Sequence, residues 1–313
     1  MYRIGIDLGG TNVKAGIVDN NGNIVAKSKI KTLSDRPYEE VIKDMANQCK
    51  KLMADFGITK EEVSQVGIGC PGAITGATGV IEYSNNLNWK NVPMGEMLGN
   101  LLSLPVKISN DANVAALGEA LYGAGKKYDD VIMLTLGTGV GGGIIIGKKL
   151  IEGNESKGAE LGHAVMCLGG ELCTCGRRGC IEAYCSATAL IRETKKAMES
   201  DPNSKMWELV GGNIDKASGI TAFDGEKLGD KTAAKVVKQY VFDLSEAIMN
   251  YCNIFRPQAI ILGGGVCAQG KNLTDRIIAL CREGHYGFRG TPSVEILTAE
   301  RENDAGILGA ASL

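Results

Sequence analysis

The chain has 313 residues, of which 44% are hydrophobic and 22% are charged, which is typical of a globular protein with roughly two domains. Lysine and arginine number 34 against 36 aspartates and glutamates, a formal charge of −2 that argues against binding to nucleic acid by bulk charge. The uncharged stretch of residues 131–147 is broken by glycines and is shorter than the ~20 apolar residues of a membrane span, so we expect no membrane segment.

The beginning of the chain lacks the pattern of a signal peptide. Met1-Tyr2-Arg3 runs directly into the strand-like residues 4–7, with no apolar core or cleavage site of small residues between them. We therefore expect a cytoplasmic, reducing environment, in which most of the 10 cysteines are free thiols or metal ligands.

The first part of the chain predicts three strands, a helix and two further strands. Residues 4–7, 13–18 and 24–30 read as strands joined by tight turns. Apolar residues at three- and four-residue spacing predict a helix over residues 37–56, with Pro37 in its first turn and Gly57 as its stop signal. Residues 66–69 and 106–109 predict short buried strands.

The second part begins with the same pattern. Residues 131–136 and 140–146 predict strands around Gly137-Thr138-Gly139, which aligns with Gly9-Gly10-Thr11 as a weak internal repeat of about half the chain. A long helix is predicted over 231–253, a strand over 259–262, a helix from about 272 and a short helix over 304–311. We expect an α/β protein whose two halves pack across a cleft.

Three glycine-rich turns follow predicted strands and predict a phosphate-binding cradle, because backbone N–H groups without a nearby Cβ can converge on phosphate oxygens. The turns comprise Gly9, Gly10, Thr11 and Asn12; Gly137, Thr138 and Gly139; and Gly263, Gly264 and Gly265. Asp7, at the end of its strand, could hold Mg²⁺ through water. The alternative is that these glycines serve hairpin geometry alone.

Two nucleotide-binding patterns overlap in one stretch, and both are incomplete. Residues 137–142 satisfy G-x-G-x-x-G, but the strand-like Ile144-Ile145-Ile146 follows where a dinucleotide fold requires a helix. Residues 142–149 approach the P-loop pattern, but Lys149 occupies the required Ser/Thr position. The sequence therefore favours a strand–turn–strand cradle.

A histidine and three cysteines have the spacing of a closed metal site. His163, Cys173, Cys175 and Cys180 form H-x9-C-x-C-x4-C, and three thiolates with one imidazole suit a structural tetrahedral Zn²⁺. The alternatives are disulfides or unrelated thiols, and Cys167 and Cys185 lie close enough to replace a proposed ligand.

Three carboxylates are candidates for chemistry. Asp111 follows the strand 106–109 and precedes a helical stretch, so it is either a helix N-cap or a base that accepts a hydroxyl proton during phosphoryl transfer. Glu160 and Glu182 flank the predicted metal loop, which could aim both at one polar ligand such as a sugar. Their alternative role is surface charge.

Together these motifs resemble the ROK family (repressors, open reading frames, sugar kinases), over nearly the whole chain. The resemblance rests on residues 7–12, residues 136–143, Glu160-x-Gly162-His163 and the segment from Cys173 to Glu182, and the cysteine motif is its most specific part. It implies an actin-like ATPase (ribonuclease H-like) fold with lobes at 1–117 plus 301–313 and at 118–300. It also implies that the protein uses ATP and Mg²⁺, binds a structural zinc ion, and forms homodimers or dimers of dimers.

Within the family the motifs look most like those of bacterial glucokinases, and this resemblance implies an enzyme of carbohydrate metabolism that phosphorylates glucose at its 6-hydroxyl. By resemblance Asp111 is the catalytic base, and the sugar site is lined by Gly72, Asn85, Asn110, Asp111, Glu160, His163 and Glu182. His163 then binds zinc with one ring nitrogen and sugar with the other. Thr138, Gly139, Gly264 and Gly265 hold phosphates and adenosine. Segments around Pro71-Gly72 and residues 85–89 favour glucose.

Two alternatives stay open. One is the same chemistry on N-acetylmannosamine, allose or fructose, and the other is a non-catalytic sugar sensor. The family's repressors carry a DNA-binding region ahead of the first glycine loop; here that loop begins at residue 9, so we expect no DNA binding.

Overall fold

The computed structural model describes residues 1–284, 286 and 293–313 of the chain. By its contacts the chain divides into two compact units, Met1–Val131 with Gly143–Ala159 and Ala299–Leu313, and Ile132–Gly142 with Glu160–Thr298. The lobes expected from the sequence have different boundaries, and those boundaries stay a prediction. Among the described residues, none of the helices combines the length and apolarity that crossing a membrane requires.

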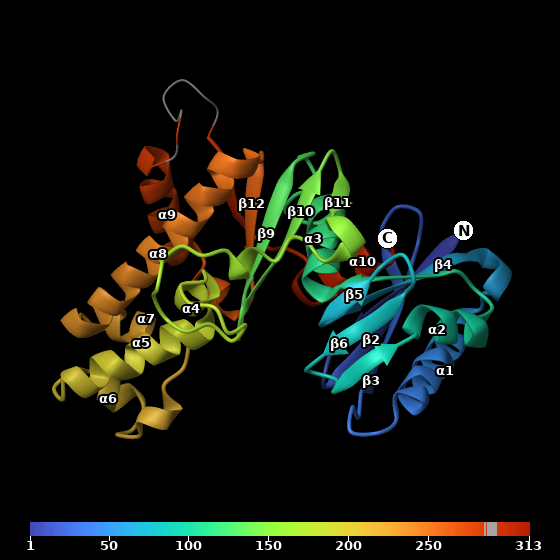
Figure 1. Ribbon diagram of the computed structural model, residues 1–313, viewed down its shortest axis with the longest axis horizontal. Coiled ribbons are helices and arrows are strands. Elements are labelled where there is room, and N and C mark those ends of the chain that lie inside the picture. The colour runs from blue at the N-terminus through green and yellow to red at the C-terminus, as the bar shows by residue number, and fades with distance from the viewer. Residues whose placement is uncertain (285, 287–292) are drawn as a thin grey trace. The chain divides into compact units, whose positions relative to one another are not determined.

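The first unit contains a five-stranded sheet of order β3-β2-β1-β4-β8. Its strands β2, β3 and β4 are labelled in Figure 1. Strands β1 to β3 form an antiparallel meander, and β4 and β8 extend it in parallel with β1. The strands are β1 (Tyr2–Leu8), β2 (Asn12–Val18), β3 (Ile24–Lys31), β4 (Val63–Cys70) and β8 (Val106–Asn110). A small antiparallel sheet comprises β5 (Ala73–Thr75), β6 (Val80–Ser84) and β7 (Trp89–Val92). All five strands predicted from the sequence in this part are confirmed.

Helices cover both faces of this sheet because side chains alternate along β1. Ile4, Ile6 and Leu8 are fully buried in one core with α1 and α2, whereas Gly5 faces the backbone of α10. The helices are α1 (Tyr38–Phe56), α2 (Met94–Leu102), α3 (Asp111–Tyr122) and α10 (Ala305–Ala310), with short 3₁₀ turns η1 (Lys60–Glu62), η2 (Asn154–Ser156) and η6 (Glu302–Asp304). As predicted, Gly57 stops α1: it is the C-cap residue that follows Phe56, and it has φ 83°.

Glycines let α10 approach the sheet and α3 at backbone distance. A Cβ at Gly67 would lie 1.7 Å from the carbonyl oxygen of Ala310, and one at Gly309 would lie 1.6 Å from that of Val114. No side chain can be accommodated at such separations, so the C-terminal helix depends on these glycines for its place in the unit.

We expect Gly67→Ala to lower the free energy of unfolding by about 3 kcal/mol, because its methyl group would meet main chain that cannot rotate away. Gly219→Ala is the control, since its φ lies outside the left-handed region and its Cβ would meet only the Cβ of Ala187, at 3.9 Å. Chemical denaturation of both variants measures the difference. An unchanged transition midpoint for Gly67→Ala would contradict the close packing.

The second five-stranded sheet has the order β11-β10-β9-β12-β13, which repeats the plan of the first and supports the predicted internal repeat. Its strands are β9 (Val131–Leu136), β10 (Val140–Ile146), β11 (Lys149–Ile151), β12 (Ala259–Gly263) and β13 (Glu295–Thr298). A strand does follow the 137–139 turn, as the sequence predicts, so the dinucleotide and P-loop patterns are excluded here.

Helices make up most of the second unit (Figure 1). They are α4 (Glu182–Cys185), α5 (Ala187–Ser200), α6 (Met206–Leu209), α7 (Thr221–Lys227), α8 (Lys231–Phe255) and α9 (Lys271–Gly284), with 3₁₀ turns η3 (Leu161–His163), η4 (Ile214–Lys216) and η5 (Gly265–Gln269). The predicted long helix and the helix from about residue 272 are confirmed as α8 and α9. Asp230 caps α8 by accepting a hydrogen bond from the Ala233 amide at 2.8 Å.

Candidate functional site

In the first unit, several predicted site residues gather where strands end. The turn between β1 and β2 is closed by the Gly9 amide, which donates to the Asn12 carbonyl at 3.0 Å. A Cβ at Gly10 would lie 2.9 Å from the carbonyl oxygen of Asn86, so this glycine turn lies directly against the segment that follows β6. Thr11 is exposed, which leaves this turn accessible to a ligand.

Asp7, the expected Mg²⁺ residue, is paired with a cation from its own sheet. Lys14 stands opposite Asp7 in the β1–β2 register, and its Nζ donates to Oδ2 of Asp7 at 3.1 Å. The two side chains are 25% and 28% exposed. Sequence reasoning missed Lys14, although the antiparallel hairpin predicted there would have placed the two side chains together. A magnesium ion held through Asp7 would share this carboxylate with Lys14.

Asp111 lies at the junction of β8 and α3, but it is not the cap of that helix. Asn110 is the cap, because its Oδ1 accepts a hydrogen bond from the Ala112 amide at 2.9 Å. Asp111 is exposed and occupies the first helical position, where its Oδ1 also accepts from the Ala112 amide. Burial raises the pKa of the Cys70 thiol well above its usual value, and the nearby Asp111 charge raises it further. The N-cap interpretation of Asp111 is therefore wrong, and the carboxylate stands at the accessible end of the strand.

Gly72 joins this group through its backbone and Asn85 through its side chain. The side-chain Nδ2 of Asn110 donates to the Gly72 carbonyl at 3.3 Å. Gly72 has φ 118°, and a Cβ there would lie 2.1 Å from the carbonyl oxygen of Tyr83, so the two chain segments touch. The Tyr83 hydroxyl donates to Oδ1 of Asn85. Because the parallel strands β1, β4 and β8 end at one edge of the sheet, the fold collects Gly72, Asn85, Asn110 and Asp111 beside the first glycine turn.

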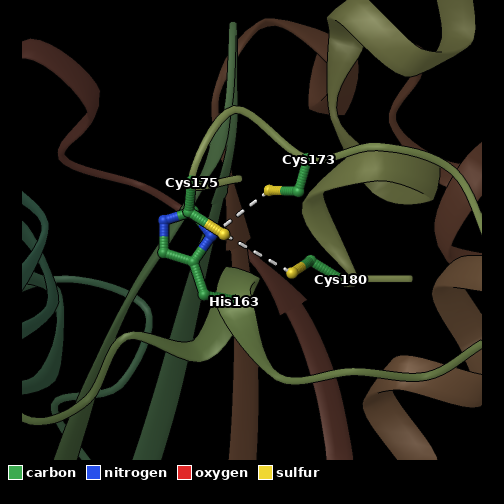
Figure 2. Close-up of side chains that lie close together, drawn as sticks. All are labelled: His163, Cys173, Cys175 and Cys180. Carbon is green, nitrogen blue, oxygen red and sulfur yellow. Dashed lines mark hydrogen bonds between the residues drawn. The ribbon is translucent and has the colours of Figure 1, made fainter. Parts of the chain in front are cut away.

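In the second unit, the predicted metal ligands converge. The donor atoms of His163, Cys173, Cys175 and Cys180 all lie within 4.8 Å of one another (Figure 2). Sγ of Cys173 is 3.5 Å from Nδ1 of His163, and Sγ of Cys175 is 3.7 Å from Sγ of Cys180. Tetrahedral Zn–S and Zn–N bonds of ~2.3 and ~2.0 Å require such pairs to be about 3.5–3.8 Å apart. The donor set and its spacing therefore fit a metal ion of this kind.

Glycines shape the loop that carries these ligands. Gly176 and Gly179 have φ 86° and 82°, and a Cβ at Gly179 would lie 1.6 Å from the carbonyl oxygen of Cys167. The Cys173 amide donates to the carbonyl of Arg177 at 2.8 Å, which closes the turn between the ligands. These glycines and this hydrogen bond shape the turns that carry the ligands.

The thiols differ in acidity. Burial raises the pKa of Cys173 to about 12 and also raises that of Cys180, whereas the hydrogen bond from the Arg177 amide lowers that of Cys175. A bound metal must displace these protons, so its affinity falls as the pH is lowered.

The second and third glycine turns lie side by side. β9 and β12 are neighbours in the sheet, and a Cβ at Gly264 would lie 2.4 Å from the carbonyl oxygen of Leu136 at the end of β9. Thr138, Gly264 and Gly265 are exposed. The fold therefore brings the 137–139 and 263–265 turns to one accessible edge.

Glu160 and Glu182 differ in their surroundings. Glu160 is exposed and immediately precedes η3, the turn that carries His163. Glu182 is half-buried at the start of α4, and its Oε2 accepts from the Val140 amide at 3.1 Å while its Oε1 accepts from the Thr174 hydroxyl at 2.6 Å. Its alternative role as plain surface charge does not agree with this fixed position.

Two sheets of identical strand order, each with a glycine turn after its first strand, define an actin-like ATPase fold. The ROK family model matches residues 3–313, and the chain belongs to the ROK family. The chain is 36% identical to a glucokinase of Thermotoga maritima over 99% of its own length and 96% of that protein.

Solved structures agree with this assignment. A ROK family glucokinase from Streptomyces griseus, in complex with glucose and AMPPNP, is 33% identical with a TM-score of 0.80, covering 100% of this chain and 98% of that one. A ROK hexokinase from Thermus thermophilus is 28% identical with a TM-score of 0.84, covering 99% and 97%.

Proposed function

We propose that this protein is an ATP-dependent hexokinase of the ROK type that phosphorylates glucose at its 6-hydroxyl. The observation that carries the proposal is the full-length similarity to ROK glucokinases, one of them described with glucose and an ATP analogue. The glycine turns and the polar groups at the strand ends of the first unit are the groups that such a reaction needs.

In this proposal Asp111 is the base that accepts the proton of the 6-hydroxyl as the γ-phosphoryl group transfers in line. The residues that the family resemblance assigns to sugar binding are Gly72, Asn85, Asn110, Glu160, His163 and Glu182. The contacts that bring Gly72, Asn85, Asn110 and Asp111 together support their proposed role in sugar binding. Nδ1 of His163 faces the cysteine sulfurs, which leaves Nε2 for a sugar hydroxyl.

The nucleotide phosphates are held by the backbone amides of the glycine turns at Gly9, Gly10, Thr11 and Asn12, at Gly137, Thr138 and Gly139, and at Gly264 and Gly265. Mg²⁺ bound near Asp7 offsets phosphate charge. Zinc at His163, Cys173, Cys175 and Cys180 supplies a fixed fold for the segment between Glu160 and Glu182 and takes no part in the chemistry. The enzyme acts in the cytoplasm as a homodimer or a dimer of dimers.

A coupled assay of ATP consumption with a panel of hexoses tests this function. We expect glucose to give the highest kcat/KM, because a site that bonds individual hydroxyls rejects sugars that leave its polar groups unpaired. A higher kcat/KM with N-acetylmannosamine, allose or fructose would move the assignment to another sugar kinase. Sugar binding without ATP consumption for every hexose would favour the non-catalytic sensor.

A further inference from the structure

One carboxylate joins the metal loop, which we define as residues 163–180, to the glycine turn at 137–139. The Val140 amide, which directly follows this turn, donates to Oε2 of Glu182 at 3.1 Å. The Thr174 hydroxyl donates to Oε1 of the same side chain at 2.6 Å. Sγ of Cys173 lies 3.4 Å from that Oε1 as well. The two oxygens of Glu182 therefore contact the metal loop on one side and the glycine turn on the other.

The same turn is held by the chain on either side of the metal loop. The Ala187 amide donates to the Gly137 carbonyl at 2.8 Å, and the Thr188 hydroxyl donates to the Thr138 carbonyl at 2.7 Å. Before the loop, Gly162 passes so close to β10 that a Cβ would lie 2.0 Å from the carbonyl oxygen of Val140. A shift of the segments around the metal would therefore move the backbone of the turn.

Gly139 permits the contact between Glu182 and the glycine turn. A Cβ at Gly139 would lie 2.3 Å from Oε2 of Glu182, so any side chain at this position would push the carboxylate away. Gly137 and Gly139 remain half-exposed and Thr138 exposed, which leaves the turn accessible to a phosphate from its other side.

Thr174 stands between two metal ligands, Cys173 and Cys175. A metal bound to both sulfurs restrains the backbone on each side of Thr174 and with it the direction of the Thr174 hydroxyl. The hydroxyl in turn holds one oxygen of Glu182, and the other oxygen holds the Val140 amide. This is a continuous chain of contacts from the metal ligands to the glycine turn.

We propose that Thr174 is a positioning residue that holds Glu182 against the glycine turn, so that metal occupancy and nucleotide binding strengthen each other. The inference rests on the proposed function in one respect, which is that the 137–139 turn binds nucleotide phosphate. Because coupling between two binding equilibria is reciprocal, a nucleotide must raise zinc affinity by the same factor by which zinc raises nucleotide affinity.

The zinc affinity of the holoenzyme tests the coupling without any turnover. It is measured by competition with a chromophoric chelator, with and without AMPPNP and excess Mg²⁺. We expect the analogue to raise zinc affinity about five- to tenfold in the unmodified protein. Thr174→Val, which keeps the shape and loses the hydroxyl, is expected to reduce the effect to less than about twofold and to weaken AMPPNP binding about three- to tenfold. Thr174→Ser is expected to restore both values.

Thr232→Val is the matched control, because it removes a hydroxyl–carboxylate hydrogen bond of the same 2.6 Å length, to Asp201, outside the contacts described above. It should leave the coupling unchanged. Zinc affinity that is the same with and without bound analogue would overturn the coupling, and full coupling in Thr174→Val would overturn the role of Thr174. No binding of AMPPNP to the zinc-loaded protein would instead overturn the proposed function, and this inference with it.

Discussion

Asp111→Asn is expected to lower kcat for glucose phosphorylation by about 10²- to 10⁴-fold, the range that a positioned general base contributes. Asparagine has nearly the same shape and can still face the end of β8, but it cannot accept the proton of the 6-hydroxyl. Because Asn110 rather than Asp111 caps α3, the substitution removes no cap, and the fold should be retained. Steady-state kinetics together with glucose titration by calorimetry separate the loss of kcat from a loss of binding.

Asp55→Asn is the control for this variant. Asp55 is 60% exposed on α1, where it pairs only with the nearby Lys51 among the ion pairs of the described residues, and its loss should change kcat less than twofold. Turnover of Asp111→Asn within tenfold of the unmodified enzyme, with folding and zinc content intact, would remove Asp111 from the role of base.

Cys180→Ser is expected to abolish stoichiometric zinc binding, taking the metal content from about one per chain to near zero. A closed structural site has no spare ligand, and its binding free energy is part of the folding free energy of the segment. We expect the melting temperature to fall by about 10 °C. We also expect kcat/KM to fall more than about 100-fold, because His163, Glu160 and Glu182 lose their fixed positions. Metal analysis, calorimetric melting and the coupled assay measure the three effects.

Cys167→Ser is the matched control in the same loop. Cys167 is exposed and lies outside the group of converging donor atoms, so its substitution should leave zinc content and activity within about twofold. Zinc loss from Cys167→Ser together with zinc retention in Cys180→Ser would replace the proposed ligand with Cys167. An absence of zinc from the unmodified protein would reject the metal site altogether.

Local patterns in the sequence predicted the strands β1 to β4, β8 to β10 and β12 and the helices α1, α8, α9 and α10, and they singled out the four residues whose donor atoms converge. The strands β5 to β7 and β13 and the helices α2 and α5 were not predicted. The strand-like residues 4–7 and the helical spacing over residues 37–56 are local signals, and they predicted β1 and α1 within two residues at each end. The four converging donor residues were predictable because metal binding requires particular residue types at short spacing, and His163 to Cys180 belong to one continuous segment. The strand after the 137–139 turn was predictable because β-branched residues follow it.

Only the tertiary structure decided which distant residues meet. The pairing of Lys14 with Asp7 follows from the hairpin register, and the contact of Gly72 with Tyr83 from a turn that no local pattern describes. Asn110 rather than Asp111 caps α3 because the strand ends one residue later than predicted. The contact between Glu182 and Val140 joins residues 42 positions apart. Sequence periodicity reports which face of an element is buried, whereas the partner on that face is set by how the elements pack.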